Sequence, residues 1–356
     1  MSTSTRALSL RLAAHEGARE LSISGAAAGD LSFRREGRRI RCSNGASRSY
    51  FTLHPRDRSL TLGDRSYPGA VKVSLRPEGG LRAEVQLDLE AYVRGVVAGE
   101  LPLLRALPAE LEAQAVAART YAVSRWRERS RAGRAPFLWD DTRDQVYLPP
   151  RPAQSSALRE AHSRLDAAIT ATSGEVLIYK SELFDSRYHA ACGGETAPLS
   201  AVPGSASAPC AACKGAPAEL EWSFTATQGE LSQVARALGL GDRLVIVEPG
   251  HSLLRGRWSD VHLIGKAGSK TVPVGRLRAL LGAERFASNL ILRTWPHPGS
   301  PIASGLRIDG RGRGHGVGMC QEGAHELAER GRSKTQILAH YYPGTSTQSW
   351  SRVTTF

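Results

Sequence analysis

Residues 88–102 read DLEAYVRGVVAGELP, and this stretch separates a strand-rich beginning of the chain from a helical continuation. Apolar side chains recur at helical spacing from Leu89 to Val97, which predicts a helix. Asp88 stands directly before this run and is the expected N-cap. Glu100 follows the last apolar residue of the run, so the sequence places one carboxyl group at the end of a helix.

The elements on either side of this stretch differ in kind. Before it, short apolar runs separated by turn residues predict strands at 21–23, 40–42, 50–53, 59–62, 71–75 and 81–87. After it, we expect helices at 108–126, 156–171, 229–239, 274–282 and 333–341 and strands at 175–179, 182–188, 243–247 and 260–264. A Gly-rich stretch at 310–323 and a loop at 197–218 are the main interruptions.

This order of elements predicts an α+β fold. We expect a β-rich N-terminal module in residues 1–80, packed on a mixed α/β core in residues 81–345 that carries one long cleft, and a C-terminal tail in residues 346–356. A chain of 356 residues is long enough for one large or two joined domains.

Composition limits the classes of partner. The net charge of +13 implies attraction to polyanions, which include nucleic acid, anionic lipid and acidic cell-wall polymers. No apolar run approaches the ~18 residues of a membrane span, so no transmembrane segment is predicted. Charged residues interrupt the first 21 positions, and no export signal is visible there. The odd count of 5 cysteines argues against a disulfide framework.

Three separated pairs of segments carry a resemblance to a known family. The first pair is 89–102 with AQAVAARTYA at 113–122, the second is DTRDQVY at 141–147 with YHAACGGET at 188–196, and the third is GRGRGHGVGMCQEGA at 310–324 with ILAHYY at 337–342. Together they span about residues 80–345 and resemble the stage II sporulation protein D family.

The resemblance implies a peptidoglycan lytic transglycosylase, a non-hydrolytic lyase with Glu100 as its catalytic residue. Such an enzyme cleaves the β-1,4 bond between N-acetylmuramic acid and N-acetylglucosamine in glycan strands stripped of stem peptides, and leaves 1,6-anhydro ends. A cell-wall amidase is the implied upstream partner, and the implied location is the cell envelope, although a cytoplasmic location stays open. The implied processes are cell-wall remodelling, cell division or sporulation, and the sequence does not choose among them.

The chemistry of Glu100 agrees with this role. A glycosidic oxygen leaves only when protonated, so the acid must be held neutral near pH 7 by apolar neighbours. Val96, Val97 and Leu101 supply such neighbours along the chain. One carboxyl group suffices, because the muramic acid 6-hydroxyl can attack its own anomeric carbon and give its proton to the ionised Glu. The alternative is a surface carboxylate at a helix end.

Six further residues are candidates for the substrate site. They are Gln114, Arg119, Gln145, Tyr147, Tyr188 and His315. Arginine can bind the lactyl carboxylate of muramic acid, and glutamine can bracket sugar hydroxyls and amides. A salt bridge within the helix pair is an equal alternative for Arg119, and buried packing is the commoner role for the two tyrosines. A structural role is also the commoner one for a single histidine such as His315.

A Cys/His cluster predicts a structural zinc site. His189, Cys192, Cys210 and Cys213 form two pairs of ligand residues separated by a loop, a spacing that fits a closed site with three thiolates and one imidazole. Zinc would clamp the loop 197–218. Free thiols beside a buried histidine, or a redox pair of Cys210 and Cys213, stay open as alternatives. No organic cofactor is expected.

The rival functional class is a non-catalytic protein that uses a basic cleft to bind glycan or nucleic acid and carries the same zinc site. Aromatic residues make up only 6% of the chain, and no basic–aromatic motif is present, which argues against nucleic acid. We therefore expect peptidoglycan glycan strands as the partner.

Overall fold

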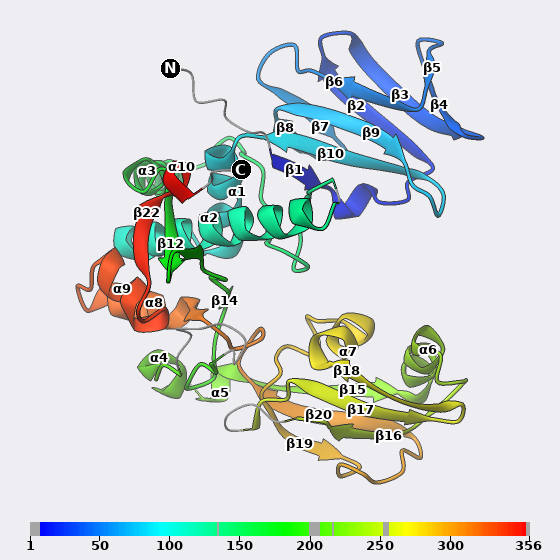
Figure 1. The fold of residues 1–356 in the computed structure, drawn as a ribbon, viewed down its shortest axis with the longest axis vertical. Helices are drawn as coiled ribbons and strands as arrows, with labels where there is room; N and C mark the ends of the chain where they lie inside the picture. Colours follow the sequence, from blue (N-terminus) through cyan, green and yellow to red (C-terminus); the bar gives the residue numbers. More distant parts are fainter. Residues whose placement is uncertain (1–7, 134, 199–206, 216, 252–255, 354–356) are drawn as a thin grey trace. The chain divides into compact units, whose positions relative to one another are not determined.

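The computed structural model describes residues 8–133, 135–198, 207–215, 217–251 and 256–353. The chain divides into two compact units, Met1–Asp185 with Ser346–Phe356, and Ser186–Thr345 (Figure 1). The first seven residues, and residues 199–206 and 216 of the predicted loop 197–218, lie outside the described part.

The first unit begins with two sheets. One has the strand order β11-β1-β10-β9-β6 and the other β5-β4-β3-β2-β7-β8 (Figure 1). The bounds are β1 Leu8–Arg11, β2 Glu20–Ala26, β3 Gly29–Glu36, β4 Arg39–Cys42, β5 Ser47–Arg48, β6 Tyr50–Leu53, β7 Ser59–Leu62, β8 Arg65–Pro68, β9 Ala70–Leu75, β10 Leu81–Leu87 and β11 Leu138–Trp139. Phe33 of β3 and Phe51 of β6 are buried with ring centroids 5.1 Å apart, so the two sheets share an apolar core.

Helices follow the sheets in the first unit. They are α1 Leu89–Glu100, α2 Pro108–Arg131 and α3 Ser156–Ala171, followed by β12 Glu175–Tyr179 and β13 Glu182–Leu183. The Asp88 carboxylate accepts a hydrogen bond of 2.9 Å from the Ala91 N–H, which confirms the predicted N-cap of α1. The expected tail contributes β22 Ser346–Ser349, antiparallel to β12, and α10 Trp350–Val353.

The second unit contains three short sheets, with orders β15-β20-β19, β16-β17-β18 and β14-β21. Its elements are β14 Tyr188–His189, α4 Ala211–Gly215, α5 Pro217–Leu220, β15 Glu221–Thr227, α6 Gln228–Leu238, β16 Leu244–Pro249, β17 Asp260–Gly265, β18 Gly268–Pro273, α7 Val274–Leu281, β19 Ile291–Trp295, β20 Gly305–Arg311, β21 Met319–Cys320, α8 Gln321–Glu329 and α9 Lys334–Tyr341. Phe224, Leu231, Val261, Leu277 and Ile308 belong to its main buried core, to which both larger sheets and the helices α6 and α7 contribute.

The predicted α+β class is confirmed, and so are the helices beginning at Pro108 and Ser156. Several elements were not predicted, among them β3, β20 and the helix α8, which begins at Gln321 inside the stretch expected to be Gly-rich loop. The division at residues 80 and 345 and the long cleft stay predictions.

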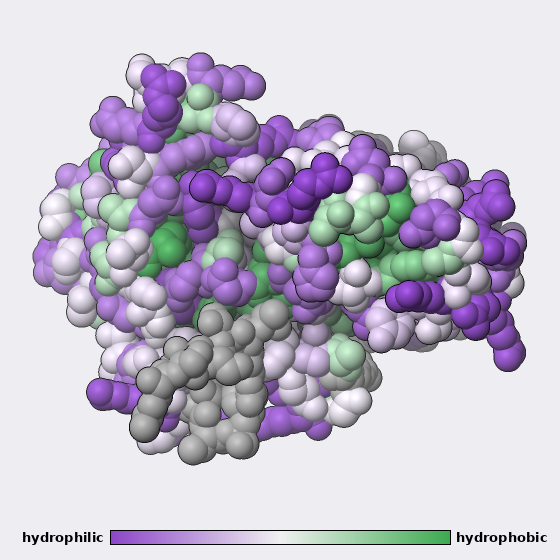
Figure 2. All heavy atoms as spheres, turned by 90° about the horizontal axis from the view of Figure 1, so that it is seen from above, coloured by the Kyte–Doolittle hydropathy of each residue, from purple (hydrophilic) through white to green (hydrophobic). Residues whose placement is uncertain are grey.

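The surface of the described residues is mixed. Hydrophilic side chains cover most of the face shown in Figure 2, and hydrophobic side chains reach it in smaller patches. The large apolar side chains that are clearly exposed among the described residues are Tyr50, Leu104, Leu292 and Trp295. Within the described ranges, no helix has both the length and the apolar character needed to cross a bilayer.

Candidate functional site

Glu100 is the last residue of α1, as its sequence position predicts. Its side chain is half-buried, and its Oε1 accepts a hydrogen bond of 2.7 Å from the backbone N–H of Val146. Val146 lies in the DTRDQVY segment at 141–147, so the fold brings a segment of the first pair and a segment of the second pair together at this carboxyl group. A backbone N–H fixes the position of a side chain more firmly than a side-chain donor does, because a backbone donor loses no rotamer freedom when the hydrogen bond forms.

Two glycines of α1 permit this approach. A methyl group added at Gly95 would lie 2.1 Å from Cε2 of Tyr147, and one added at Gly99 would lie 2.5 Å from the Val146 carbonyl oxygen. Leu148 N–H also donates to the Gly95 carbonyl oxygen at 2.9 Å. The glycines therefore let an extended segment lie directly on the helix that carries Glu100.

Asp144 anchors the same segment to α2. Its buried carboxylate accepts two hydrogen bonds from the Arg129 guanidinium, at 2.9 and 3.0 Å, and one of 2.8 Å from the Trp139 N–H. The Tyr121 hydroxyl donates to it at 3.3 Å. A bidentate charged pair fixes geometry as well as contributing energy, so Asp144 positions the residues that follow it. This role was not predicted from the sequence, although Asp144 lies in the segment DTRDQVY.

The side chain of Arg119 is buried and forms its hydrogen bonds within the first unit. Its side chain is 0% exposed and forms a bidentate pair with Glu90, with distances of 2.9 and 2.6 Å. It also donates to the carbonyl oxygen of Glu175 at 3.1 Å. These contacts favour the salt-bridge alternative over a direct contact with substrate, because they engage Nε, Nη1 and Nη2 of the guanidinium within the first unit.

Gln145 and Tyr147 are also buried, each 1% exposed. The Gln145 Oε1 accepts a hydrogen bond of 2.9 Å from the Tyr92 hydroxyl, and the Tyr147 ring stacks between Tyr67 and Tyr92 at 6.5 and 6.0 Å. Burial raises the pKa of the Tyr92 hydroxyl well above its ordinary value. This placement favours packing and positioning roles for both residues.

Gln114 differs from these residues. It is 1% exposed, and neither its amide oxygen nor its amide nitrogen has a hydrogen-bond partner among the described residues. A buried amide without partners costs free energy unless water or a ligand satisfies it. Gln114 therefore remains a candidate for a polar contact.

The other two candidates, Tyr188 and His315, belong to the second unit. Tyr188 is half-buried in β14, where it pairs with Met319 of β21. The His315 Nδ1 accepts a hydrogen bond of 3.1 Å from the Val317 N–H. Loss of hydration, followed by the charges of Arg187 and other arginines, lowers the pKa of His315 to about 3. His315 is therefore a neutral, fixed ring at neutral pH.

His189 lies beside His315, with ring centroids 5.5 Å apart. Its Nδ1 lies 3.1 Å from the carbonyl oxygen of Val317, so Nδ1 carries the proton. Burial lowers the pKa of His189 well below its ordinary value. The backbone N–H and carbonyl oxygen of Val317 thus fix the two rings in opposite tautomers, with the proton on Nδ1 in His189 and on Nε2 in His315.

Four buried cysteines gather in the second unit. The sulfurs of Cys192, Cys210, Cys213 and Cys320 all lie within 4.8 Å of one another, and this group could hold a metal ion. Two of the separations are 3.9 Å, between Cys210 and Cys320, and 3.5 Å, between Cys213 and Cys320. A tetrahedral site with metal–sulfur bonds of about 2.3 Å requires separations of ~3.8 Å. The described thiols therefore fit a tetrathiolate site.

Backbone donors also suit this site. The N–H groups of Cys192, Gly194 and Cys213 point at cysteine sulfurs, with distances of 3.3, 3.4 and 3.4 Å. The guanidinium of Arg257 is 2% exposed and donates to the carbonyl oxygens of Cys192 and Glu195. Four thiolates around a divalent ion carry two net negative charges, and a buried guanidinium nearby offsets part of that charge.

The observed group differs in one member from the predicted ligands. Cys320 joins it, and His189 lies outside it, because β21 runs parallel to β14 and brings Cys320 into pairing with His189. Cys320 lies 128 residues after Cys192 and gave no spacing signal, so only its presence in the matched segment GVGMCQ could have suggested it. Among the described cysteines, Cys42 remains apart from this group.

Comparisons with known proteins agree with the arrangement of motifs. The family model for stage II sporulation protein matches residues 78–179. Stage II sporulation protein D of Bacillus amyloliquefaciens is 30% identical over 275 residues, which cover 72% of this chain and 73% of that protein. The protein of the same name in Bacillus subtilis strain 168 is 28% identical, with 73% of this chain and 74% of that protein covered.

These matches define the class: the chain belongs to the stage II sporulation protein D family. A further relative is the amidase enhancer of Bacillus subtilis strain 168, which is 26% identical over 309 residues. That alignment covers 72% of this chain and 40% of the amidase enhancer.

Proposed function

We propose that this protein acts on the cell wall as a peptidoglycan lytic transglycosylase with Glu100 as its single catalytic carboxyl group. The observation that carries the proposal is the contact between Glu100 Oε1 and the Val146 N–H, because it joins the first matched motif to the second at a carboxyl group. Family membership supports the cell-wall role. The supporting contacts of Asp144, Gly95 and Gly99 keep that carboxyl group in one place.

Glu100 would act first as an acid and then as a base. Its proton passes to the glycosidic oxygen between N-acetylmuramic acid and N-acetylglucosamine, and the C–O bond breaks. The muramic acid 6-hydroxyl then attacks the anomeric carbon, and the ionised Glu100 takes the proton of that hydroxyl. In this second step, in which Glu100 is the base, the Val146 N–H stabilises the ionised carboxylate through a charge-assisted hydrogen bond. The products are a 1,6-anhydro end and a free N-acetylglucosamine end, and no water is consumed.

The test compares Glu100→Gln with wild type on purified, peptide-free glycan strands. Mass spectrometry should detect anhydromuramic ends with the wild type, and their yield should fall at least about a hundredfold with Glu100→Gln, the range expected for loss of a general acid. Glu112→Gln on α2 is the matched control and should keep wild-type yield. Absence of anhydro ends with the wild type, or equal yields from both, would refute the proposal.

The substrate and partner follow from the same reasoning. We propose peptide-stripped glycan strands as substrate, with an amidase acting before this enzyme in the cell envelope. The similarity to a protein named amidase enhancer supports a functional link to an amidase. Strands that retain stem peptides should be cleaved more slowly than stripped ones.

We also propose that zinc occupies the thiol group and has a structural role. Cys192, Cys210, Cys213 and Cys320 would hold it, and four protein ligands leave no position for a reacting water. The ion would link α4 and β21 to the segment after β14, and its binding free energy would stabilise the second unit.

Metal analysis of protein purified without chelator tests this site. We expect about one zinc per chain in the wild type, a clear loss in Cys320→Ser, and wild-type content in His189→Ala and in the control Cys42→Ser. Zinc loss in His189→Ala with full zinc in Cys320→Ser would instead support the ligand set predicted from the sequence. Wild-type protein without zinc would contradict both.

A further inference from the structure

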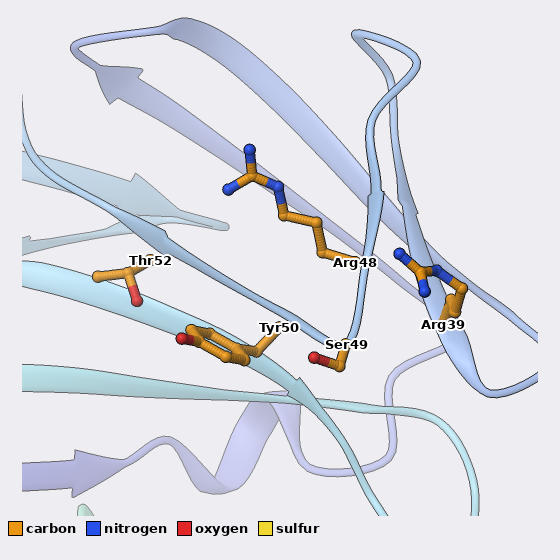
Figure 3. A pocket seen from close by; sticks show the side chains of 5 residues that line it. All are labelled: Arg39, Arg48, Ser49, Tyr50 and Thr52. Carbon is orange, nitrogen blue, oxygen red and sulfur yellow. The ribbon is translucent and has the colours of Figure 1, made fainter.

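A pocket lies in the N-terminal part of the first unit, before residues 78–179 that match the family model. Its volume is about 480 Å³, and its lining residues are Arg39, Arg48, Ser49, Tyr50 and Thr52 (Figure 3). Binding pockets for small molecules commonly measure about 300 to 1,000 Å³, so one or two sugar units are of suitable size.

The topology explains why the pocket forms there. β5 is an edge strand of one sheet and β6 is an edge strand of the other, and Ser49 is the single residue between them. Both strands are therefore edges with one unpaired side at the place where the chain passes between the sheets. Figure 3 shows the five side chains around this crossing.

Tyr50 presents an aromatic face to solvent. Side chains alternate along β6, so Phe51 and Leu53 enter the core while Tyr50 and Thr52 lie on the outer face. Tyr50 is 55% exposed, one of the four large hydrophobic side chains most exposed among the described residues. An exposed ring with a hydroxyl at its tip can lie against the C–H face of a sugar while its hydroxyl bonds to a polar group.

The two arginines supply cationic donors. Arg39 is held in place by Ser47, with Nε donating to the hydroxyl at 3.2 Å and Nη2 to the carbonyl oxygen at 2.6 Å. Among the described residues, neither Nη1 of Arg39 nor the guanidinium of Arg48 has a hydrogen-bond partner. The Arg48 guanidinium carbon lies 5.7 Å from the centre of the Phe51 ring, a contact that leaves its N–H groups unbonded. These N–H groups are therefore available for an anion, and Arg39 is already oriented for one.

The residues that line the pocket include no carboxylate to offset these charges. None of the five lining residues is acidic, and Lys72 adds a further cation 5.2 Å from the centre of the Tyr50 ring. The nearby Glu36 is already paired with Arg41 at 3.1 Å. The pocket is thus a local concentration of positive charge with hydroxyl groups on one side.

We propose that this pocket binds an acidic sugar unit of a glycan chain, with Arg39 and Arg48 on the anionic group and the Tyr50 ring against the sugar. The anionic group is a carboxylate or a phosphodiester, because a guanidinium recognises both. Nucleic acid fits less well, since single strands need successive aromatic platforms for their bases and the pocket offers one ring. The site lies apart in sequence from Glu100 and would anchor the chain to its polymer whether or not Glu100 cleaves it.

The test measures binding of labelled polymers to the full chain carrying Glu100→Gln, so that cleavage cannot remove the probe. The probes are peptide-free glycan strands with muramic carboxylates, a polymer of hexose units joined by phosphodiesters, neutral chitohexaose and single-stranded DNA. In this background Arg48→Gln and Tyr50→Ala should each weaken binding of an acidic polymer about tenfold, roughly the contribution of one hydrogen bond to a charged group. Arg58→Gln removes an equal charge outside the pocket and should change binding less than about twofold.

Each possible result of these binding measurements either supports or overturns the proposed site. Weaker binding of the glycan strands by the Arg48→Gln and Tyr50→Ala variants identifies the carboxylate as the recognised group, and weaker binding of the hexose phosphodiester polymer identifies the phosphodiester. Equal binding of chitohexaose, binding of DNA alone, or equal effects of Arg48→Gln and Arg58→Gln would overturn the proposal. Because Arg48 and Tyr50 are exposed, their replacement leaves the core intact, and circular dichroism should confirm this.

Discussion

Gly95→Ala should destabilise the first unit although alanine is the better helix former. The gain in helix propensity is about 1 kcal/mol. Against it, the new methyl carbon would lie 2.1 Å from Cε2, 2.6 Å from Cδ2 and 2.7 Å from Cζ of Tyr147. Ordinary carbon contacts are about 3.5 to 4.0 Å, so the ring would have to move by more than ~1 Å.

The Tyr147 ring has little space for that movement. It is 1% exposed and stacks between Tyr67 and Tyr92, and overpacking of this kind costs about 1 to 3 kcal/mol or more. Because the contact of 2.1 Å is severe, we take the upper end of that range, about 3 kcal/mol, and subtract the ~1 kcal/mol of helix propensity, which gives a net loss of ~2 kcal/mol in the free energy of unfolding. The displaced segment carries the Val146 N–H, so cleavage of glycan strands should fall as well.

The assay is urea unfolding, with hydrogen exchange of the α1 amides to assign the change to this helix. Gly275→Ala in α7 is the control, because its methyl group meets nothing within 4 Å and the helical gain should appear there as ~0.5 to 1 kcal/mol of added stability. A Tyr147→Leu background should remove much of the Gly95→Ala penalty, because the two changes share one contact. A penalty of the same size in both backgrounds, or a stabilising Gly95→Ala, would refute the proposed contact.

Two further outcomes are expected. Arg119→Met should cost ~2 to 3 kcal/mol in urea unfolding because it removes the charged hydrogen bonds to the partly exposed Glu90 carboxylate. Arg159→Met on the exposed side of α3 should cost under about 1 kcal/mol. The free energy of unfolding should also decrease as the pH is lowered, because the pKa of His315 is 6.5 in the unfolded chain and about 3 in the folded chain. The unfolded chain takes up a proton that the folded chain excludes, so this contribution is complete above about pH 6.5 and is lost as pH falls towards about 3. His315→Asn should flatten the acid limb of the stability profile, and an unchanged limb would contradict the assignment.

Local sequence patterns were sufficient to predict many of the helices and strands. Apolar residues at helical spacing, the N-cap at Asp88 and proline at the first position of α2 were sufficient to place α1 and α2, because these signals act within a few residues. Strands such as β6 and β10 were also placed correctly, since alternation and turn residues are local signals. The strand β3 was missed because charged residues at its exposed end mask the alternation of Leu31 and Phe33.

The roles of the site residues depended on distant partners. The sequence alone left open whether Arg119 binds substrate or a neighbouring carboxylate. Its hydrogen bonds to Glu90 favour the second alternative. For Tyr147, buried packing was already the commoner expectation, and the position of its ring between two other tyrosines favours that role. Spacing along a chain indicates which residues share a helix face, and it carries no information on which element covers that face.

The sequence by itself determined the α+β class, the position of Glu100 at the end of a helix and the segments that carry the family resemblance. Only the tertiary structure decided which groups meet. It placed the Val146 N–H on Glu100 across 46 residues, and it brought Cys320 to three cysteines more than 100 residues earlier. The physical reason is that helices and strands form from contacts between near neighbours, whereas a carboxyl site or a metal site forms where elements pack together.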